Sequence, residues 1–190
     1  RPDGTFGVGV NMTRAEFVTV LCRMFSWEKR DYEQSIHRDC DGHWAQGYID
    51  AAAEHGVESH AGGFFPDDYI SRMEMAKMLV QAVGTPISEP GEHELGSVYG
   101  NVTISSSGVT LRNTVIAGDL YLTGGIGLGD VLLENVTVLG KIMASGAGES
   151  NQGESSIILR NVTADEMVVD SISNQFVTVR SEGDTDIAST

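Results

Sequence analysis

Two arginines stand inside two copies of one short pattern, in which Ser or Thr is followed by Arg, one further residue and Glu. The copies are Thr13-Arg14-Ala15-Glu16 and Ser71-Arg72-Met73-Glu74. A cation at the first position of a helix faces the positive end of the helix dipole, which costs roughly 0.3–1 kcal/mol. Repeating an arginine there suggests a use beyond folding, because an Arg fork beside unpaired helix-start amides can bind an anion.

The other residues of the pattern predict helix starts. Thr13 with Glu16, and Ser71 with Glu74, each form a capping box in which hydroxyl and carboxylate satisfy each other's backbone amides. Apolar residues follow both boxes at helical spacing: Phe17, Val20, Leu21, Met24 and Phe25 after the first, and Met75, Met78, Leu79 and Ala82 after the second. We therefore expect two related amphipathic helices.

The similarity between the copies extends beyond the boxes. Adding 58 to the residue number carries Gly4 onto Gly62, Phe6 onto Phe64 and Leu21 onto Leu79. A period of this length predicts tandem supersecondary units that bury their apolar faces against one another.

A third helix is expected between the copies, with Asp41 as its cap and its end near Gly56. Its buried face would carry Trp44, Tyr48, Ile49 and Ala52. Gly62, Gly63, Pro66, Asp67 and Asp68 are typical of a turn and lead into the second box.

Cys22 and Cys40 are too few for a disulfide scaffold and lack the spacing of a metal site. They could pair if the protein lies outside the cell. The simpler interpretation is that Cys22 is a small buried hydrophobic residue on its helix. Asp39, Asp41 and Gly42 form a short acidic turn without the spaced oxygen ligands of a calcium loop, so we expect no metal and no cofactor.

The composition limits the classes of partner. The chain has 190 residues and a formal net charge of −15, which argues against binding to nucleic acid. No apolar run approaches the length of a membrane span, so we expect no membrane insertion. The length is enough for one large or two small domains.

Several segments together resemble the S-layer homology motif of bacterial cell-surface proteins. They are His43-Trp44-Ala45, Tyr48-Ile49, Gly56-Val57, Gly63-Phe64-Phe65-Pro66-Asp67 and Ile70-Ser71-Arg72-Met73-Glu74. The resemblance covers a full motif over residues 36–84 and half a motif over residues 1–27, where Val8 stands at the position of Pro66. It implies a small helical domain over residues 1–84 and an extracellular location at the cell wall.

What the resemblance implies for function is non-covalent anchoring to secondary cell-wall polysaccharide. A pyruvylated sugar would bind in grooves between motifs, with Arg14, Arg72, Trp44, Asp67 and Gly62 as the binding residues. One and a half motifs cannot form a complete three-motif unit. We therefore expect one of three situations: upstream motifs are missing from this sequence, further motifs come from elsewhere in a longer parent protein, or this copy serves only as a structural spacer. The residues alone leave two alternatives open: the arginines could pair with acids such as Asp67 or Asp68, and Trp44 could lie in the core.

Beyond a Pro-containing linker at residues 85–94, the pattern changes to short alternating strands. The segment Val109–Asn113 is echoed by Val131–Asn135 and Ile157–Asn161, at offsets of 22 and 26, with the extra residues inside a Gly/Ser-rich loop between Ser145 and Ser156. Residues 95–190 therefore predict a short parallel β-helix of roughly four rungs, in which equivalent residues stack in columns.

The repeat assigns residues to these columns. Inward columns would hold Leu111, Leu133 and Leu159, and Ile116, Val138 and Ala164; a turn column would hold Asn113, Asn135 and Asn161; and an outer column of alternating charge would hold Arg112, Glu134 and Arg160.

The sequence thus predicts an α+β multidomain, non-enzymatic surface protein, with a β-helix that serves as a spacer or display region. One alternative is a wall-anchored carbohydrate-active enzyme with a catalytic β-helix, which would need a clustered carboxylate pair on one outer face. Another is an assembly subunit that contacts other surface-layer subunits through open solenoid edges.

Overall fold

The computed structural model describes residues 11–57, 62–146, 156–170 and 177–188. The chain forms two compact units, Arg1–Ala82 and Val83–Thr190. The repeat matches at Gly4 and Phe6, and most of the loop between Ser145 and Ser156, lie outside the described residues.

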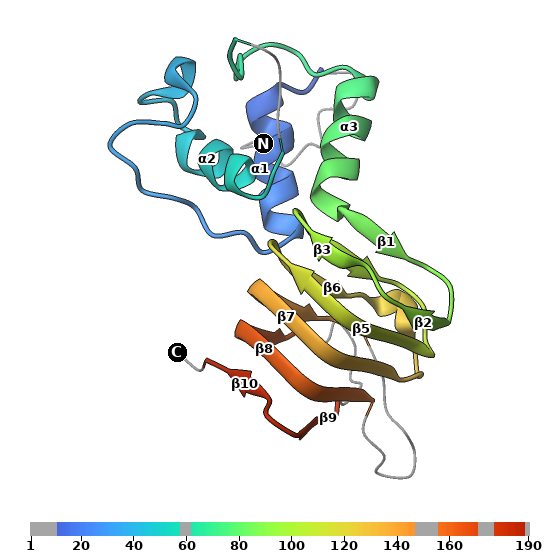
Figure 1. The fold of residues 1–190 in the computed structure, drawn as a ribbon. Coiled ribbons are helices and arrows are strands. Elements are labelled where there is room, and N and C mark those ends of the chain that lie inside the picture. Colours follow the sequence, from blue (N-terminus) through green and yellow to red (C-terminus); the bar gives the residue numbers. More distant parts are fainter. Residues whose placement is uncertain (1–10, 58–61, 147–155, 171–176, 189–190) are drawn as a thin grey trace. The chain divides into compact units, whose positions relative to one another are not determined.

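The first unit is helical, as predicted. It contains α1 (Arg14–Met24), a 3-10 turn η1 (Arg38–Cys40), α2 (Gln46–Glu54) and most of α3 (Arg72–Val83) (Figure 1). One apolar cluster joins these elements, with Leu21, Ile49, Phe64 and Met78 among its fully buried side chains. Within the described residues, each helix is too short or too polar to cross a membrane.

The buried face of α1 differs from the predicted one. Ala15, Val18, Leu21 and Cys22 are buried, whereas Val20 and Met24 of the expected stripe are 46% and 67% exposed. The helix carries apolar residues on both faces, and contacts with α2 bury the face that begins at Ala15. Periodicity alone does not reveal which of two apolar faces a neighbour covers.

The start of α2 also differs from the prediction. Ala45, not Asp41, occupies the N-cap position, and it makes no side-chain capping bond. The Asp41 carboxylate instead accepts a hydrogen bond from the Ser35 amide at 2.7 Å. Ile49 and Ala52 are buried as expected, but Trp44 precedes the helix and is 56% exposed, so the expectation of a core tryptophan is wrong.

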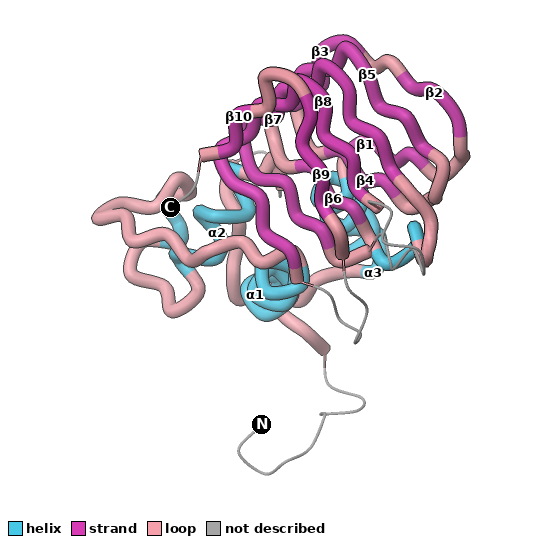
Figure 2. The backbone as a smooth tube through the Cα atoms, turned by 90° about the horizontal axis from the view of Figure 1, so that it is seen from below, coloured by secondary structure: helices cyan, strands magenta, loops and turns pink. Residues whose placement is uncertain are grey.

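The second unit is a parallel β-solenoid, which confirms the predicted fold class. Its strands stack side by side with parallel pairing throughout the described ladders (Figure 2). They are β1 (Thr85–Ile87), β2 (Gly91–His93), β3 (Gly96–Val98), β4 (Val102–Ile104), β5 (Val109–Ile116), β6 (Leu120–Leu122), β7 (Val131–Ala144), β8 (Ile157–Val169), β9 (Val179–Glu182) and β10 (Asp186–Ile187), with a 3-10 turn η2 (Gly124–Ile126) after β6.

The predicted columns are present. Leu111 pairs with Leu133 and Leu133 with Leu159, and all three are buried. The asparagines occupy a left-handed corner with φ between 49° and 53°, where the Asn135 amide donates to Asn113 at 3.3 Å and the Asn161 amide to Asn135 at 3.0 Å. Stacked amides therefore hold successive coils together at this corner.

The outer charged column is longer than predicted. Arg112 contacts Glu92 at 3.1 Å and Glu134 at 3.3 Å, while Arg160 contacts Glu134 at 2.8 Å and Glu182 at 2.9 Å. Glu182 lies opposite Arg160 and extends the column to four positions of alternating charge, whereas Glu92 lies opposite Thr110 and reaches Arg112 from outside the column.

Residues 85–94, expected as a linker, contain strands of the solenoid. β1 pairs with β4 over Thr85–Ile87, and β2 pairs with β5 over Gly91–His93. Pro86 is tolerated because β1 is short and parallel pairing uses only alternate backbone groups on one side. The first coil therefore begins directly after α3, ten residues earlier than the sequence predicts.

Candidate functional site

Arg14 is the most heavily bonded of the predicted binding residues. Its side chain is only 9% exposed. Nε and Nη2 donate to Glu74 Oε1 at 3.0 and 2.8 Å, and Nη1 donates to the Phe65 carbonyl at 3.0 Å and lies 3.3 Å from Asp68 Oδ2. The arginine of the first box thus binds the carboxylate of the second box and the turn that precedes it.

Both capping boxes form as the sequence predicts. Thr13 Oγ1 accepts from the Glu16 amide at 3.2 Å, and Glu16 accepts from the Thr13 amide at 2.9 Å. The corresponding distances between Ser71 and Glu74 are 3.3 and 2.7 Å. These bonds fix the first turn of each helix and so set the direction in which each arginine leaves the backbone.

The expected anion site at the helix-start amides of α1 is not available. The Arg14 amide donates to the Asp68 carbonyl and the Ala15 amide to the Pro66 carbonyl, both at 3.0 Å. Protein carbonyls therefore satisfy the amides that an anion would need. At this helix start, the Arg14 guanidinium is the group left to bind an anion.

The turn that receives Arg14 is held by Asp39. Its carboxylate accepts hydrogen bonds from the Phe64 amide at 3.1 Å and from the Phe65 amide at 2.6 Å. Gly62 has φ of +106° and Phe65 has φ of +53°, so the turn twice uses the left-handed region. Asp39 therefore places the Phe65 carbonyl that accepts from Arg14.

Asp39 stays ionised in this setting. Partial burial acts to raise its pKa, but the amides of Phe65 and Phe64 stabilise the charged carboxylate and leave the pKa below its ordinary value. The pKa of Glu74 is lowered to about 2, first by hydrogen bonds with Ser71 and then by the bond from Arg14. Both carboxylates are therefore charged at neutral pH.

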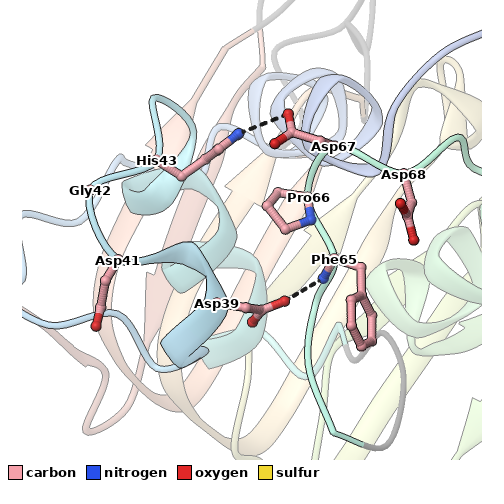
Figure 3. Close-up of a pocket in the computed structure, with 8 residues that line it drawn as sticks. All are labelled: Asp39, Asp41, Gly42, His43, Phe65, Pro66, Asp67 and Asp68. Carbon is pink, nitrogen blue, oxygen red and sulfur yellow. Dashed lines mark hydrogen bonds and ion pairs between the residues drawn. The ribbon is translucent and has the colours of Figure 1, made fainter.

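A shallow pocket of about 350 Å³ opens beside this turn. Two stretches line it: Asp39, Asp41, Gly42 and His43 on one side, and Phe65, Pro66, Asp67 and Asp68 on the other (Figure 3). His43 Nδ1 accepts from the Ala45 amide at 3.2 Å, which leaves Nε2 to donate to Asp67 Oδ1 at 3.3 Å. Arg14 adjoins the pocket through Phe65 and Asp68.

The predicted binding residues are brought together only in part. Asp67 lines the pocket, and Gly62 begins the turn. Trp44 is not one of the lining residues, but its ring lies 5.5 Å from that of His43, which is. Arg72 is exposed, and its guanidinium makes no hydrogen bond or ion pair with any described residue. The alternative that an arginine pairs with a neighbouring acid holds for Arg14 and Asp68, whereas Asp67 pairs with His43.

Sequence reasoning missed three parts of this site. The pairing of Arg14 with Glu74 joins residues 60 apart, and no local sequence pattern predicts it. The sequence indicated Asp39 only as part of an acidic turn and His43 only as part of a motif, so neither was predicted to belong to the site. The repeat of the boxes carried the usable signal, because it placed both Arg14 and Glu74 at matched helix starts.

The cysteines take no part in a disulfide. Cys22 and Cys40 are free and buried, and Cys22 Sγ donates to the Tyr48 carbonyl at 3.2 Å. Burial raises the pKa of each thiol to about 12, so both are unreactive at neutral pH. No group of three or more potential metal ligands is present among the described residues.

Comparison with known protein families places this site in context. The family model of the S-layer homology domain matches residues 38–76, which include η1, α2, the turn and the second box. Residues 38–76 are therefore similar to S-layer homology domains. Arg14 lies outside this segment but binds two of its residues, Phe65 and Glu74.

Relatives among curated proteins agree with this assignment. Cell surface glycoprotein 1 of Acetivibrio thermocellus is 32% identical over 119 residues, which cover 53% of this chain and 5% of that protein. S-layer protein EA1 of Bacillus anthracis is 29% identical over 94 residues, 48% of this chain and 11% of that protein. These matches confirm the predicted family resemblance and the extracellular, wall-associated location.

A third relative is named as an enzyme. An uncharacterized cell wall amidase of Bacillus anthracis is 31% identical over 84 residues, 43% of this chain and 16% of that protein. The chain therefore spans between 5% and 16% of the length of these three relatives.

Proposed function

We propose that the helical unit anchors the protein to a secondary cell-wall polysaccharide by binding a carboxylate-bearing sugar, such as a pyruvate ketal, beside Arg14. The single observation that carries this proposal is the position of a nearly buried guanidinium next to an open pocket within the S-layer homology domain and its preceding helix. A guanidinium presents its donors in a planar fork, which matches a carboxylate better than an ammonium group does.

Arg14 is preorganised for this task. Two of its nitrogens are fixed by Glu74, so the side chain loses little conformational freedom when a ligand arrives. Nη1 points to Phe65 and Asp68, the side on which the pocket opens. A ligand carboxylate would therefore approach Nη1.

The remaining groups suit a sugar ring. Asp67 and Asp41 offer carboxylate oxygens that can accept hydrogen bonds from sugar hydroxyls. The exposed indole of Trp44 offers a flat apolar surface and an N–H donor beside His43, which lines the pocket. Gly62 contributes through the turn geometry rather than through a side chain.

Arg72 has a different place in this proposal. Its guanidinium is exposed and lies outside the residues that line the pocket. We therefore assign it a secondary contact with the polysaccharide, although its motif is the more complete of the two.

The solenoid serves as a non-catalytic spacer or display region. Its outer acids Glu92, Glu134 and Glu182 are each paired with arginine, and Glu166 is paired with Lys141. A hydrogen bond from Arg160 holds the pKa of Glu134 below its ordinary value, and a carboxylate that stays ionised is a poor general acid. Incubation of the chain with purified wall polysaccharide and peptidoglycan should release no new reducing ends or amino groups, and turnover would overturn this part.

The anchoring proposal is tested by sedimentation of the 190-residue chain with purified cell walls, before and after removal of their secondary polysaccharide. We expect retention on intact walls and its loss on stripped walls. Trp44→Ala should weaken retention about three- to tenfold, because an exposed indole contributes to binding and little to the fold. Tyr99→Ala is the matched control, since Tyr99 is an exposed aromatic residue of the solenoid.

Equal retention on intact and stripped walls would refute polysaccharide binding. Equal retention of the Trp44→Ala and Tyr99→Ala proteins would refute the placement of the sugar at this pocket.

A further inference from the structure

Three groups surround the Arg14 guanidinium, and they differ in how firmly they are held. Glu74 is 21% exposed and is fixed by its capping box and by two bonds from Arg14. The Phe65 carbonyl is fixed by the turn that Asp39 organises. The Asp68 carboxylate is 69% exposed and meets Arg14 at a single distance of 3.3 Å.

Asp68 adds to the fold mainly through its backbone. Its carbonyl accepts from the Arg14 amide at 3.0 Å, and its amide donates to the Phe65 carbonyl at 3.2 Å. An exposed ion pair with one contact contributes little to stability. The carboxylate can therefore swing into solvent at small cost while the turn keeps its shape.

Asp68 also lies where a ligand would arrive. It lines the pocket, and it contacts Nη1, the nitrogen on the pocket side of Arg14. We propose that the Asp68 carboxylate occupies the position of the ligand's anionic group and is displaced when that ligand binds. This inference rests on the proposed function, and it makes Asp68 the residue that sets the charge preference of the sugar-binding site.

Two consequences follow for specificity. A ligand carboxylate can replace Asp68 because the charge of Arg14 stays balanced, whereas a neutral sugar would leave the nearly buried guanidinium without this partner. Asp68 therefore selects against neutral saccharides. The same competition lowers the affinity for anionic ones, so neutralising Asp68 should strengthen their binding.

The test compares Asp68→Asn with the wild type and with Asp31→Asn. Asp31 is an exposed acid of the same unit that lies outside the pocket, so both variants remove one negative charge, and of the two residues only Asp68 contacts Arg14. The probe is a monosaccharide with a pyruvate ketal, and the same sugar without the ketal is the reference ligand. Dissociation constants for the 190-residue chain are measured by titration calorimetry, and tryptophan fluorescence monitors folding.

We expect Asp68→Asn to bind the pyruvylated sugar roughly two- to fivefold more tightly than the wild type and Asp31→Asn do, the range that the loss of one exposed competing ion pair allows. Asp68→Ser should behave in the same way and serves if the asparagine variant folds poorly. Equal affinities of the Asp68 and Asp31 variants, with clear binding by the wild type, would overturn the inference and leave the anchoring proposal intact. Failure of every protein to bind would overturn the anchoring proposal and this inference with it.

Discussion

The two box-helices α1 and α3 share a sequence pattern but bury opposite faces. Leu21 is 1% exposed and its equivalent Leu79 is 36% exposed, whereas Val20 is 46% exposed and its equivalent Met78 is 2% exposed. Further pairs follow the same rule: Cys22 at 0% against Val80 at 70%, and Met24 at 67% against Ala82 at 0%. The local sequence sets the helix, and the neighbouring elements decide which face becomes core.

The arginines of the two boxes differ in the same way. Arg14 is 8% exposed and bonded through every guanidinium nitrogen, whereas Arg72 is exposed. The difference arises because residues 66–74 pack against the start of α1. The same capping pattern thus carries a nearly buried, bonded guanidinium in one copy and an exposed arginine in the other.

The largest expected effect concerns the buried faces. Leu21→Ala should lower the free energy of unfolding of the helical unit by about 2–5 kcal/mol, because it removes buried methyl groups and leaves a cavity. Leu79→Ala should cost less than about 1 kcal/mol. Urea unfolding followed by tryptophan fluorescence measures both, since Trp27 and Trp44 are the two tryptophans of the chain and both lie in the helical unit. Equal losses would show that α3 is covered in solution.

The second comparison concerns the arginines. Arg14→Ala should destabilise the helical unit by about 2–3 kcal/mol, because Glu74 and the Phe65 carbonyl lose charge-assisted hydrogen bonds. Arg72→Ala should change the free energy of unfolding by no more than about 0.5 kcal/mol. The same urea titration tests the pair, and a large loss for Arg72→Ala would contradict the described difference.

Variants of the two capping boxes, unlike the variants above, should have equal effects on stability. Thr13→Ala and Ser71→Ala should each cost about 1 kcal/mol, since both hydroxyls accept the N3 amide in the same way. Thermal unfolding by circular dichroism at 222 nm compares the two. If one variant were silent, the boxes would not be equivalent in solution.

The smallest expected effect is the contribution of Glu74 to the pH dependence of the free energy of unfolding, which appears only in acid. Its folded pKa of about 2 lies below the unfolded value of about 4.3, so its contribution to stability is complete above the unfolded value and is lost as the pH falls from about 4.5 towards 2. Glu74→Gln should flatten this part of the stability profile. Urea midpoints measured at several pH values in this window provide the test, and an unchanged acid slope in the variant would count against the assigned role of Glu74.

Much of the fold was predictable because its signals are local or periodic. The capping boxes depend on residues three apart, and the offsets of 22 and 26 placed Leu111, Leu133 and Leu159 in one column before any pairing was known. The first coil escaped prediction because Thr85–Ile87 and Gly91–His93 are too short to show alternation beside two prolines.

For the candidate site, the sequence named residues but not their arrangement. Of the residues that the family resemblance named, Asp67 lines the pocket, Arg14 contacts two lining residues, and Trp44 lies beside the lining residue His43. The bonds that decide the site, from Arg14 to Glu74 and from Asp39 to Phe65, join residues 60 and 26 positions apart. Such pairings depend on how the helices pack, and the same packing determines which face of α1 is buried.

Binding of the wall polysaccharide at Arg14 is tested most directly by the retention of the Arg14→Lys and Arg72→Lys proteins on purified cell walls. Tryptophan fluorescence confirms that each variant is folded. Both variants keep the charge and lose the planar fork. We expect a loss of about tenfold in affinity for Arg14→Lys, which corresponds to one charge-assisted hydrogen bond, and less than about twofold for Arg72→Lys. Equal losses, or a larger loss for Arg72→Lys, would contradict it.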